Sequence, residues 1–121
     1  MAEEISIKVA TEYDIVCHEG DDFVLTMDVK NPDETDFNFS GYTAKMQVRK
    51  RRVESDPAIL TFETGGAGIT LTTGQMSIEK AAANMAGISG DYFYDLKITD
   101  SGSRIATWLY GKFKIFPTVT T

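Results

Sequence analysis

Residues 23–30 read Phe23-Val24-Leu25-Thr26-Met27-Asp28-Val29-Lys30, and this stretch decides the fold class. Apolar side chains recur at every second position from Phe23 to Val29, and Thr26, Asp28 and Lys30 lie between or after them. Successive side chains of a strand point to opposite faces. The alternation therefore predicts a β-strand with one buried face and one face in water.

The same alternation recurs in three other runs, at 5–9, 42–49 and 92–99. Their apolar faces are Ile5, Ile7 and Val9; Tyr42, Ala44, Met46 and Val48; and Tyr92, Tyr94, Leu96 and Ile98. Turn-forming residues separate the strands at 31–33, 72–75 and 100–103, and the segment 65–68 holds three glycines. About eight short strands with turns every 8–12 residues predict an all-β protein, an antiparallel β-sandwich of the Ig-like kind.

One stretch departs from the strand pattern. Residues 79–86 are rich in alanine and other good helix formers, and Gly87 follows as a natural end. They predict one short helix near 79–86. The 121 residues fit one ordinary domain. We therefore expect a single β-sandwich domain over 1–121, with a flexible arm at 1–4.

The last strand, within 104–116, is apolar on both faces. We expect Ile105, Thr107, Leu109, Phe113 and Ile115 on one face, and Ala106, Trp108, Tyr110 and Phe116 on the other. A strand buried on both sides, or one that contacts a partner, has this composition. Gly111 in its middle predicts either a β-bulge or a close approach of another backbone segment.

Composition excludes several classes of function. Cys17 is the single cysteine and His18 the single histidine, which excludes an internal disulfide, zinc-finger spacing and most histidine-based catalysis. In a strand these two neighbours face opposite ways, so they do not predict a nucleophile pair. The net charge of −6 argues against nucleic-acid binding. No apolar run approaches the ~20 residues of a membrane-spanning helix, and the acidic N-terminus lacks a signal-peptide pattern.

The charge is uneven along the chain. Residues 1–40 hold eleven acidic and two basic residues, a net charge of −9, whereas 41–121 hold a net charge of +3. Such asymmetry would orient subunits head to tail in an assembly, unless folding interleaves the two halves and cancels the field.

Four further groups of residues could form functional sites. The acidic loop 33–36 is either a calcium site or a solvated turn. The basic run 49–52 either contacts phosphate or an acidic neighbour, or is a solvated strand end. Asp91 and Asp95 share a strand face but lie about 13 Å apart, wide for a glycosidase pair. The aromatic residues form either a sugar-stacking surface or packing contacts in a core or interface; they are Tyr13, Phe37, Phe39, Tyr42, Trp108 and Tyr110.

A family resemblance covers nearly the whole chain, from about Ile15 to Thr120. The segments that carry it are Gly20–Phe23, Phe39–Arg49, Gly68–Leu71, Gly74–Ile78, Gly90–Leu96 and Leu109–Ile115. The most distinctive are Tyr94-Asp95-Leu96 and the later Leu109-x-Gly111-x-x-x-Ile115. These segments resemble small β-sandwich structural proteins of tailed bacteriophages, and they are similar to the N-terminal attachment domain of phage baseplate upper proteins.

The resemblance implies a mechanical role without an active site or cofactor. It implies an adaptor or anchoring subunit of the tail, baseplate, neck or head-fibre assembly, made in the bacterial cytoplasm and located in the virion. Its partners would be other virion proteins and further copies of itself, in a homo-oligomer or symmetric ring, with no nucleic acid or membrane.

We expect the contact residues to be Trp108, Tyr110, Phe116, Phe37, Phe39, Asp33, Arg51 and Arg52. On this assignment, replacing Trp108 with alanine impairs assembly more than it lowers the stability of the monomer. The alternative function is a carbohydrate-binding module that uses the surface aromatic residues; an enzyme is disfavoured because no catalytic motif is visible.

Overall fold

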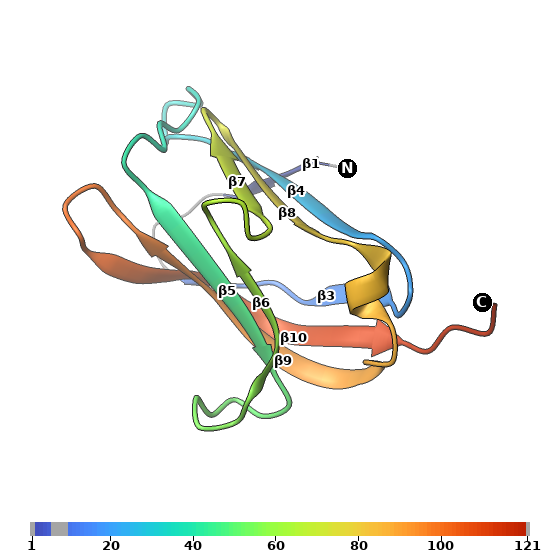
Figure 1. The fold of residues 1–121 in the computed structure, drawn as a ribbon. Coiled ribbons are helices and arrows are strands. Elements are labelled where there is room, and N and C mark those ends of the chain that lie inside the picture. The colour runs from blue at the N-terminus through green and yellow to red at the C-terminus, as the bar shows by residue number, and fades with distance from the viewer. Residues whose placement is uncertain (1, 6–9, 121) are drawn as a thin grey trace.

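Two β-sheets lie face to face in the computed structural model, which describes residues 2–5 and 10–120 (Figure 1). The smaller sheet has the order β1 (Ala2–Ile5), β4 (Phe23–Val29), β8 (Gln75–Lys80) and β7 (Ile69–Thr72). The larger has the order β2 (Thr11–Glu12), β10 (Ile105–Phe116), β9 (Gly90–Thr99), β5 (Thr43–Arg49) and β6 (Ala58–Glu63), with β3 (Ile15–His18) also on β10. The predicted all-β sandwich is confirmed.

The strand order is that of an Ig-like sandwich. In the convention for that fold, the smaller sheet corresponds to strands A-B-E-D and the larger one to G-F-C with an added C′ strand. Near the start of β9, the hydroxyl of Tyr92 donates a hydrogen bond to the carbonyl of Ser89 at 3.2 Å. In Ig-like domains, a tyrosine near the start of the corresponding strand often donates a hydrogen bond to the backbone a few residues upstream.

The N-terminal strands add parallel pairs to the otherwise antiparallel sandwich. The central pairs β4–β8, β7–β8, β5–β6, β5–β9 and β9–β10 are antiparallel, but β1 runs parallel to β4, and β2 and β3 run parallel to β10. A hairpin forces its strands to be antiparallel. β2 and β3 join β10 from the opposite end of the chain, so no hairpin fixes their direction.

The core confirms the alternation read from the sequence. Buried side chains from the two sheets include Phe23, Met27 and Val29 of β4; Met46 and Val48 of β5; and Tyr94, Leu96 and Ile98 of β9. Among the described residues no polar or charged residue is buried. Ile5 lies in β1, while the other predicted members of that strand, Ile7 and Val9, lie outside the described residues.

The predicted helix near 79–86 is shorter and begins later. Glu79 and Lys80 belong to β8, where they pair with Val24 and Phe23 of β4, and a single 3-10 turn, η1, spans Ala82–Met85. Strand pairing with β4 overrides the helix propensity of these two residues. A carboxylate oxygen of Asp22 accepts the Ala82 amide at 2.7 Å.

Of the arm expected at 1–4, residues 2–4 lie within β1, and Met1 lies outside the described residues. In the part of the chain that the structure describes, no helix is long and apolar enough to cross a membrane.

A β-bulge in β10 corrects the predicted faces of the last strand. Thr107 pairs with Lys97 and Leu109 with Leu96, so Trp108 is an extra residue without a partner on β9. The extra residue reverses the alternation. Ile105 therefore points outward and is 67% exposed. The side chains of Trp108 and Leu109 both point toward the core.

Gly111 is a site of close backbone approach, one of its two predicted roles. A Cβ at this position would lie 2.8 Å from the Tyr13 carbonyl oxygen and 2.7 Å from a carboxylate oxygen of Asp14. Tyr94 lies opposite Gly111 on β9, and its hydroxyl donates a hydrogen bond to the same Tyr13 carbonyl. The Lys112 amide donates to Asp14 at 3.0 Å. The missing side chain lets the link between β2 and β3 lie against β10.

Replacing Gly111 with alanine should therefore destabilise the fold by about 1–3 kcal/mol, the usual cost of forcing an atom into a packed site. Denaturant unfolding followed by circular dichroism measures this. Gly102→Ala is the matched control, because its new Cβ meets only Asp100 at an ordinary 3.4 Å, and its effect should stay within about 0.5 kcal/mol. Equal effects of the two changes would contradict the close-approach assignment.

Candidate functional site

The outer faces of the two sheets differ in chemistry. The smaller sheet presents polar side chains, including Thr70, Thr72, Gln75 and Ser77, together with Glu79 and the 57% exposed Val24. The larger sheet presents two cross-strand rows that mix rings and charges: Tyr110, Asp95 and Gln47; and Lys112, Phe93 and Arg49. Aromatic and arginine side chains on one face are typical of binding surfaces, so the larger sheet carries the candidate site.

Three residues form what we call the arginine–aromatic platform: Arg52, Phe93 and Tyr110. The Arg52 guanidinium lies 5.3 Å from the ring centroid of Tyr110 and 5.9 Å from that of Phe93. Both distances are within the range of cation–π attraction. Among the described residues Arg52 has no hydrogen bond or ion pair, and its side chain is exposed. The two rings thus hold a guanidinium whose donors are free.

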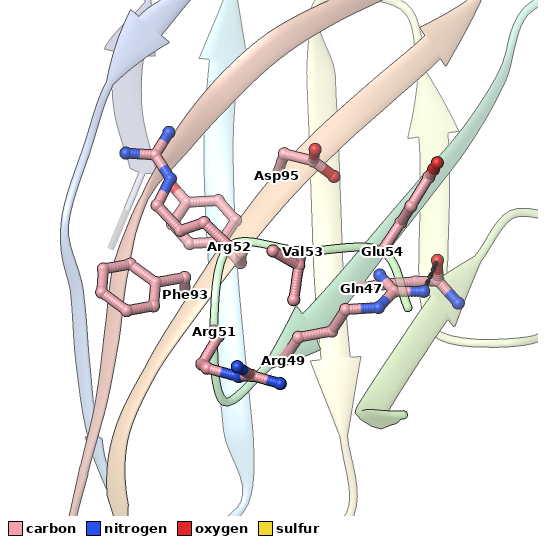
Figure 2. Close-up of a pocket in the computed structure, with 9 residues that line it drawn as sticks. Gln47, Arg49, Arg51, Arg52, Val53, Glu54, Phe93 and Asp95 are labelled. Atoms are coloured by element: carbon pink, nitrogen blue, oxygen red, sulfur yellow. Dashed lines mark hydrogen bonds between the residues drawn. The ribbon is translucent and has the colours of Figure 1, made fainter. Parts of the chain in front are cut away.

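A shallow pocket of about 80 Å³ adjoins the platform (Figure 2). Its apolar lining comes from Phe93 and from Val53, which is 43% exposed. Glu54 and Asp95 bring carboxylates to the same hollow. The pocket therefore offers an apolar surface with groups of both charges at its rim, a combination suited to a polar side chain of a partner.

The basic run 49–52 does not act as four equivalent charges. Arg49 donates to the Asp56 carbonyl at 2.8 Å and to Gln47 at 3.0 Å. Arg51 holds the Asp56 carboxylate with two hydrogen bonds, at 2.7 and 3.0 Å. This bonding lowers the pKa of the Asp56 carboxyl and raises the pKa of Arg51. Lys50 lies over the Tyr92 ring at 5.1 Å. Arg49 and Arg51 shape the loop that presents Arg52.

Phe116 occupies the far end of β10 and is 38% exposed. Its ring centroid lies 5.4 Å from that of His18, and the Lys114 ammonium lies 5.1 Å from its centre. Val16, 60% exposed, faces outward on the neighbouring strand. Lys114 also pairs with Asp91 at 3.4 Å. Phe116 is thus a surface residue, separate from the platform residue Tyr110.

Three of the other expected contact residues pack on one another instead. Phe37, Phe39 and Trp108 form an inner aromatic cluster with Tyr42, with ring centroids 4.8–5.9 Å apart. Phe39 is only 5% exposed. The bulge explains this arrangement, because it turns Trp108 toward the loop 37–42. Most of these rings meet edge to face, a favourable geometry that leaves no flat stacking surface between them.

The acidic loop 33–36 is held by bonds within itself. The Asp33 carboxylate accepts hydrogen bonds from the Thr35 hydroxyl at 2.6 Å and amide at 3.1 Å, which lower the pKa of Asp33. Asp36 pairs with Lys30 at 2.6 Å. These two carboxylates therefore have separate partners. Within 2–5 and 10–120, no three histidine, cysteine or acidic side chains gather as a metal site.

Cys17 and His18 face opposite sides of β3, as expected: Cys17 packs partly against the core and His18 is exposed. Burial, with a smaller contribution from the charge of Asp21, raises the pKa of the Cys17 thiol to about 11.

Asp91 and Asp95 share the outer face of β9, also as expected, and Asp91 pairs with Lys114.

The role of Phe93 in the platform was not predicted from the sequence. A signal was present, because Phe93 is a large apolar residue at a polar-face position between Tyr92 and Tyr94. The contact between Phe93 and Arg52 could not be predicted from the sequence, because Phe93 lies in β9 and Arg52 lies in the loop between β5 and β6.

The inner cluster changes the expectation for Trp108. Trp108→Ala should destabilise the monomer by roughly 3 kcal/mol, because it empties a partly buried site packed on Phe37 and Phe39. Tyr110→Ala, on the outer face two residues away, should cost much less. Urea unfolding of the two variants compares them directly. If Trp108→Ala unfolds at the same urea concentration as wild type, the packing role of Trp108 is wrong.

The Cys17 thiol should react slowly in the folded protein. Since only the thiolate is nucleophilic, raising the pKa from 9.0 to about 11 should slow alkylation by iodoacetamide at pH 8 about 100-fold relative to the unfolded chain. The unfolded thiol loses its proton first, so folding stability should fall as pH rises from 9 toward 11. Equal alkylation rates with and without 6 M guanidinium would contradict the buried position of this thiol.

Comparison with known proteins shows a likeness of fold alone. No family model matches the chain, and no curated protein matches it. Among solved structures, extracellular domains 3–5 of Drosophila OTK align with 94% of this chain at 18% sequence identity and a TM-score of 0.36. The alignment covers 35% of the OTK chain, so this chain spans about a third of its length.

Proposed function

We propose that this chain is a non-enzymatic structural subunit of a tailed-bacteriophage virion. It is an adaptor or anchoring protein, made in the bacterial cytoplasm, that binds neighbouring virion proteins through the outer face of its larger sheet. The single observation that carries the proposal is the arginine–aromatic platform, in which Phe93 and Tyr110 hold an exposed guanidinium that forms no hydrogen bond or ion pair with the described residues.

The physical chemistry of the platform suits a protein partner. Arginine and tyrosine are enriched at interfaces, and residues that carry most of the binding energy are drawn largely from them. Arg52 is already restrained by two rings, so less side-chain entropy is lost when it binds. Its planar guanidinium matches a carboxylate in a two-bond geometry.

The family resemblance supports the same assignment. Its most distinctive segments, Tyr94-Asp95-Leu96 and Leu109 to Ile115, lie in β9 and β10, the two strands that carry Phe93 and Tyr110. The resemblance to phage structural proteins therefore falls on the part of the fold that builds the proposed contact surface.

A carbohydrate-binding module is the second candidate, and one observation favours it. Phe93 and Tyr110 place two rings on the outer face of one sheet, as sugar-stacking surfaces do. Arg52 lies over both rings, however, where a sugar would have to stack. The platform is thus better suited to a carboxylate.

The proposal predicts that the chain is a component of phage particles. An antibody raised against the purified protein should detect it, at a constant ratio to the major structural proteins, in gradient-purified particles from a strain that carries its gene. The double change Phe93→Ala and Tyr110→Ala should lower its incorporation at least tenfold, whereas Thr70→Ala on the smaller sheet should not. Detection in the soluble fraction alone, with particles that form and infect normally, would refute the virion role.

A further inference from the structure

The charge asymmetry of the sequence persists in the ion pairs of the fold. Within the described residues, Lys30–Asp36 lies inside the acidic first forty residues. Lys45–Glu63, Arg51–Asp56 and Lys114–Asp91 all lie within 41–121. No ion pair among these residues joins the two parts. Over the residues with described side chains, the acidic and basic parts of the chain therefore do not neutralise one another by ion pairs.

The two charged loops lie at opposite ends of one strand. The turn at 31–36 comes before β5 in the chain, and the basic run 49–52 begins at the last residue of β5. The acidic loop and the Arg52 loop therefore lie toward its opposite ends (Figure 1). The seven residues of β5 separate the ends by about 23 Å at ~3.3 Å per residue. Within one molecule the two loops cannot meet.

At the acidic end, Glu34 is the carboxylate that is free to bind. Asp33 is bonded by Thr35 and Asp36 is paired with Lys30. Glu34 sits at the tip of the turn with a φ of +68°, is exposed, and has no cation within ion-pair distance among the described residues. Arg52 is its counterpart at the other end, a guanidinium restrained by rings with its donors free.

We propose that Arg52 of one copy binds Glu34 of the next, so that copies of this chain join head to tail. This inference rests on the proposed structural role and names the partner of the same platform. The contact joins two different surfaces, so each copy keeps one free platform and one free acidic turn. Repetition of such a contact closes into a ring or continues as a filament.

Charge reversal tests the contact. Wild-type protein should show a mass by light scattering that rises with concentration beyond that of a dimer. Arg52→Glu and Glu34→Arg should each weaken association at least tenfold, because each brings like charges together at the contact. An equimolar mixture of the two variants should recover association, since every contact in it again pairs opposite charges. The double variant Arg52→Glu/Glu34→Arg should also recover it.

Matched controls separate a specific contact from an effect of net charge. Arg104→Glu and Glu79→Arg reverse exposed charges elsewhere and should associate like wild type. Thermal unfolding should show all variants folded. A wild type that stays monomeric at 1 mM, or single variants that associate normally, would overturn the head-to-tail contact, as would a mixture that stays monomeric.

These outcomes are independent of the virion test. Particles that contain the chain, together with unaltered association of Arg52→Glu, would refute this contact and leave the structural role in place. Recovery of association in the mixture, together with particles that lack the chain, would support the contact and refute the virion role.

Discussion

The hydrogen bond from the Tyr94 hydroxyl to the Tyr13 carbonyl ties the link between β2 and β3 to the larger sheet, beside the pairing of both strands with β10. It forms across Gly111, where any side chain would collide with Tyr13 and Asp14. Burial raises the pKa of Tyr94, so its hydroxyl keeps the proton that it donates. Because this bond fixes the link between β2 and β3, it also sets Glu12 beside Tyr110 and His18 beside Phe116. The outer face of the larger sheet therefore depends on an interaction made at its inner side.

A second constraint divides β10 into two parts with different tasks. The bulge at Trp108 turns one aromatic ring to the inner cluster, and two residues later Tyr110 points outward to Arg52. A regular strand would place residues 108 and 110 on the same face. The extra residue thus lets neighbouring aromatic side chains serve the core and the surface, and the inner cluster ties the loop 37–42 to the sheet that carries the platform.

Local patterns in the sequence predicted the parts of the fold that local physics determines. The alternation in 23–29, 43–49 and 92–98 identified the buried faces, because each strand has one side against the core. The parallel pairing of β2 and β3, the bulge at Trp108 and the end of β8 depend on neighbours distant in sequence, and none has a local signal. Neighbours distant in sequence also determine where the expected contact residues lie. Tyr110, Phe116 and Arg52 point outward, whereas Phe39 is buried and Trp108 packs on its neighbours.

The roles of charged residues also depend on neighbours that are distant in sequence. Four consecutive basic residues look equivalent in a sequence, but Arg49 and Arg51 are bonded to Asp56 and shape the loop, and Lys50 lies on Tyr92. Arg52 differs because its neighbours are rings, which restrain a guanidinium without occupying its hydrogen-bond donors. A carboxylate in their place would satisfy those donors within the molecule. Holding Arg52 on Phe93 and Tyr110 therefore preserves its capacity to bind an acidic group from outside, and this is the physical reason to place a partner at this surface.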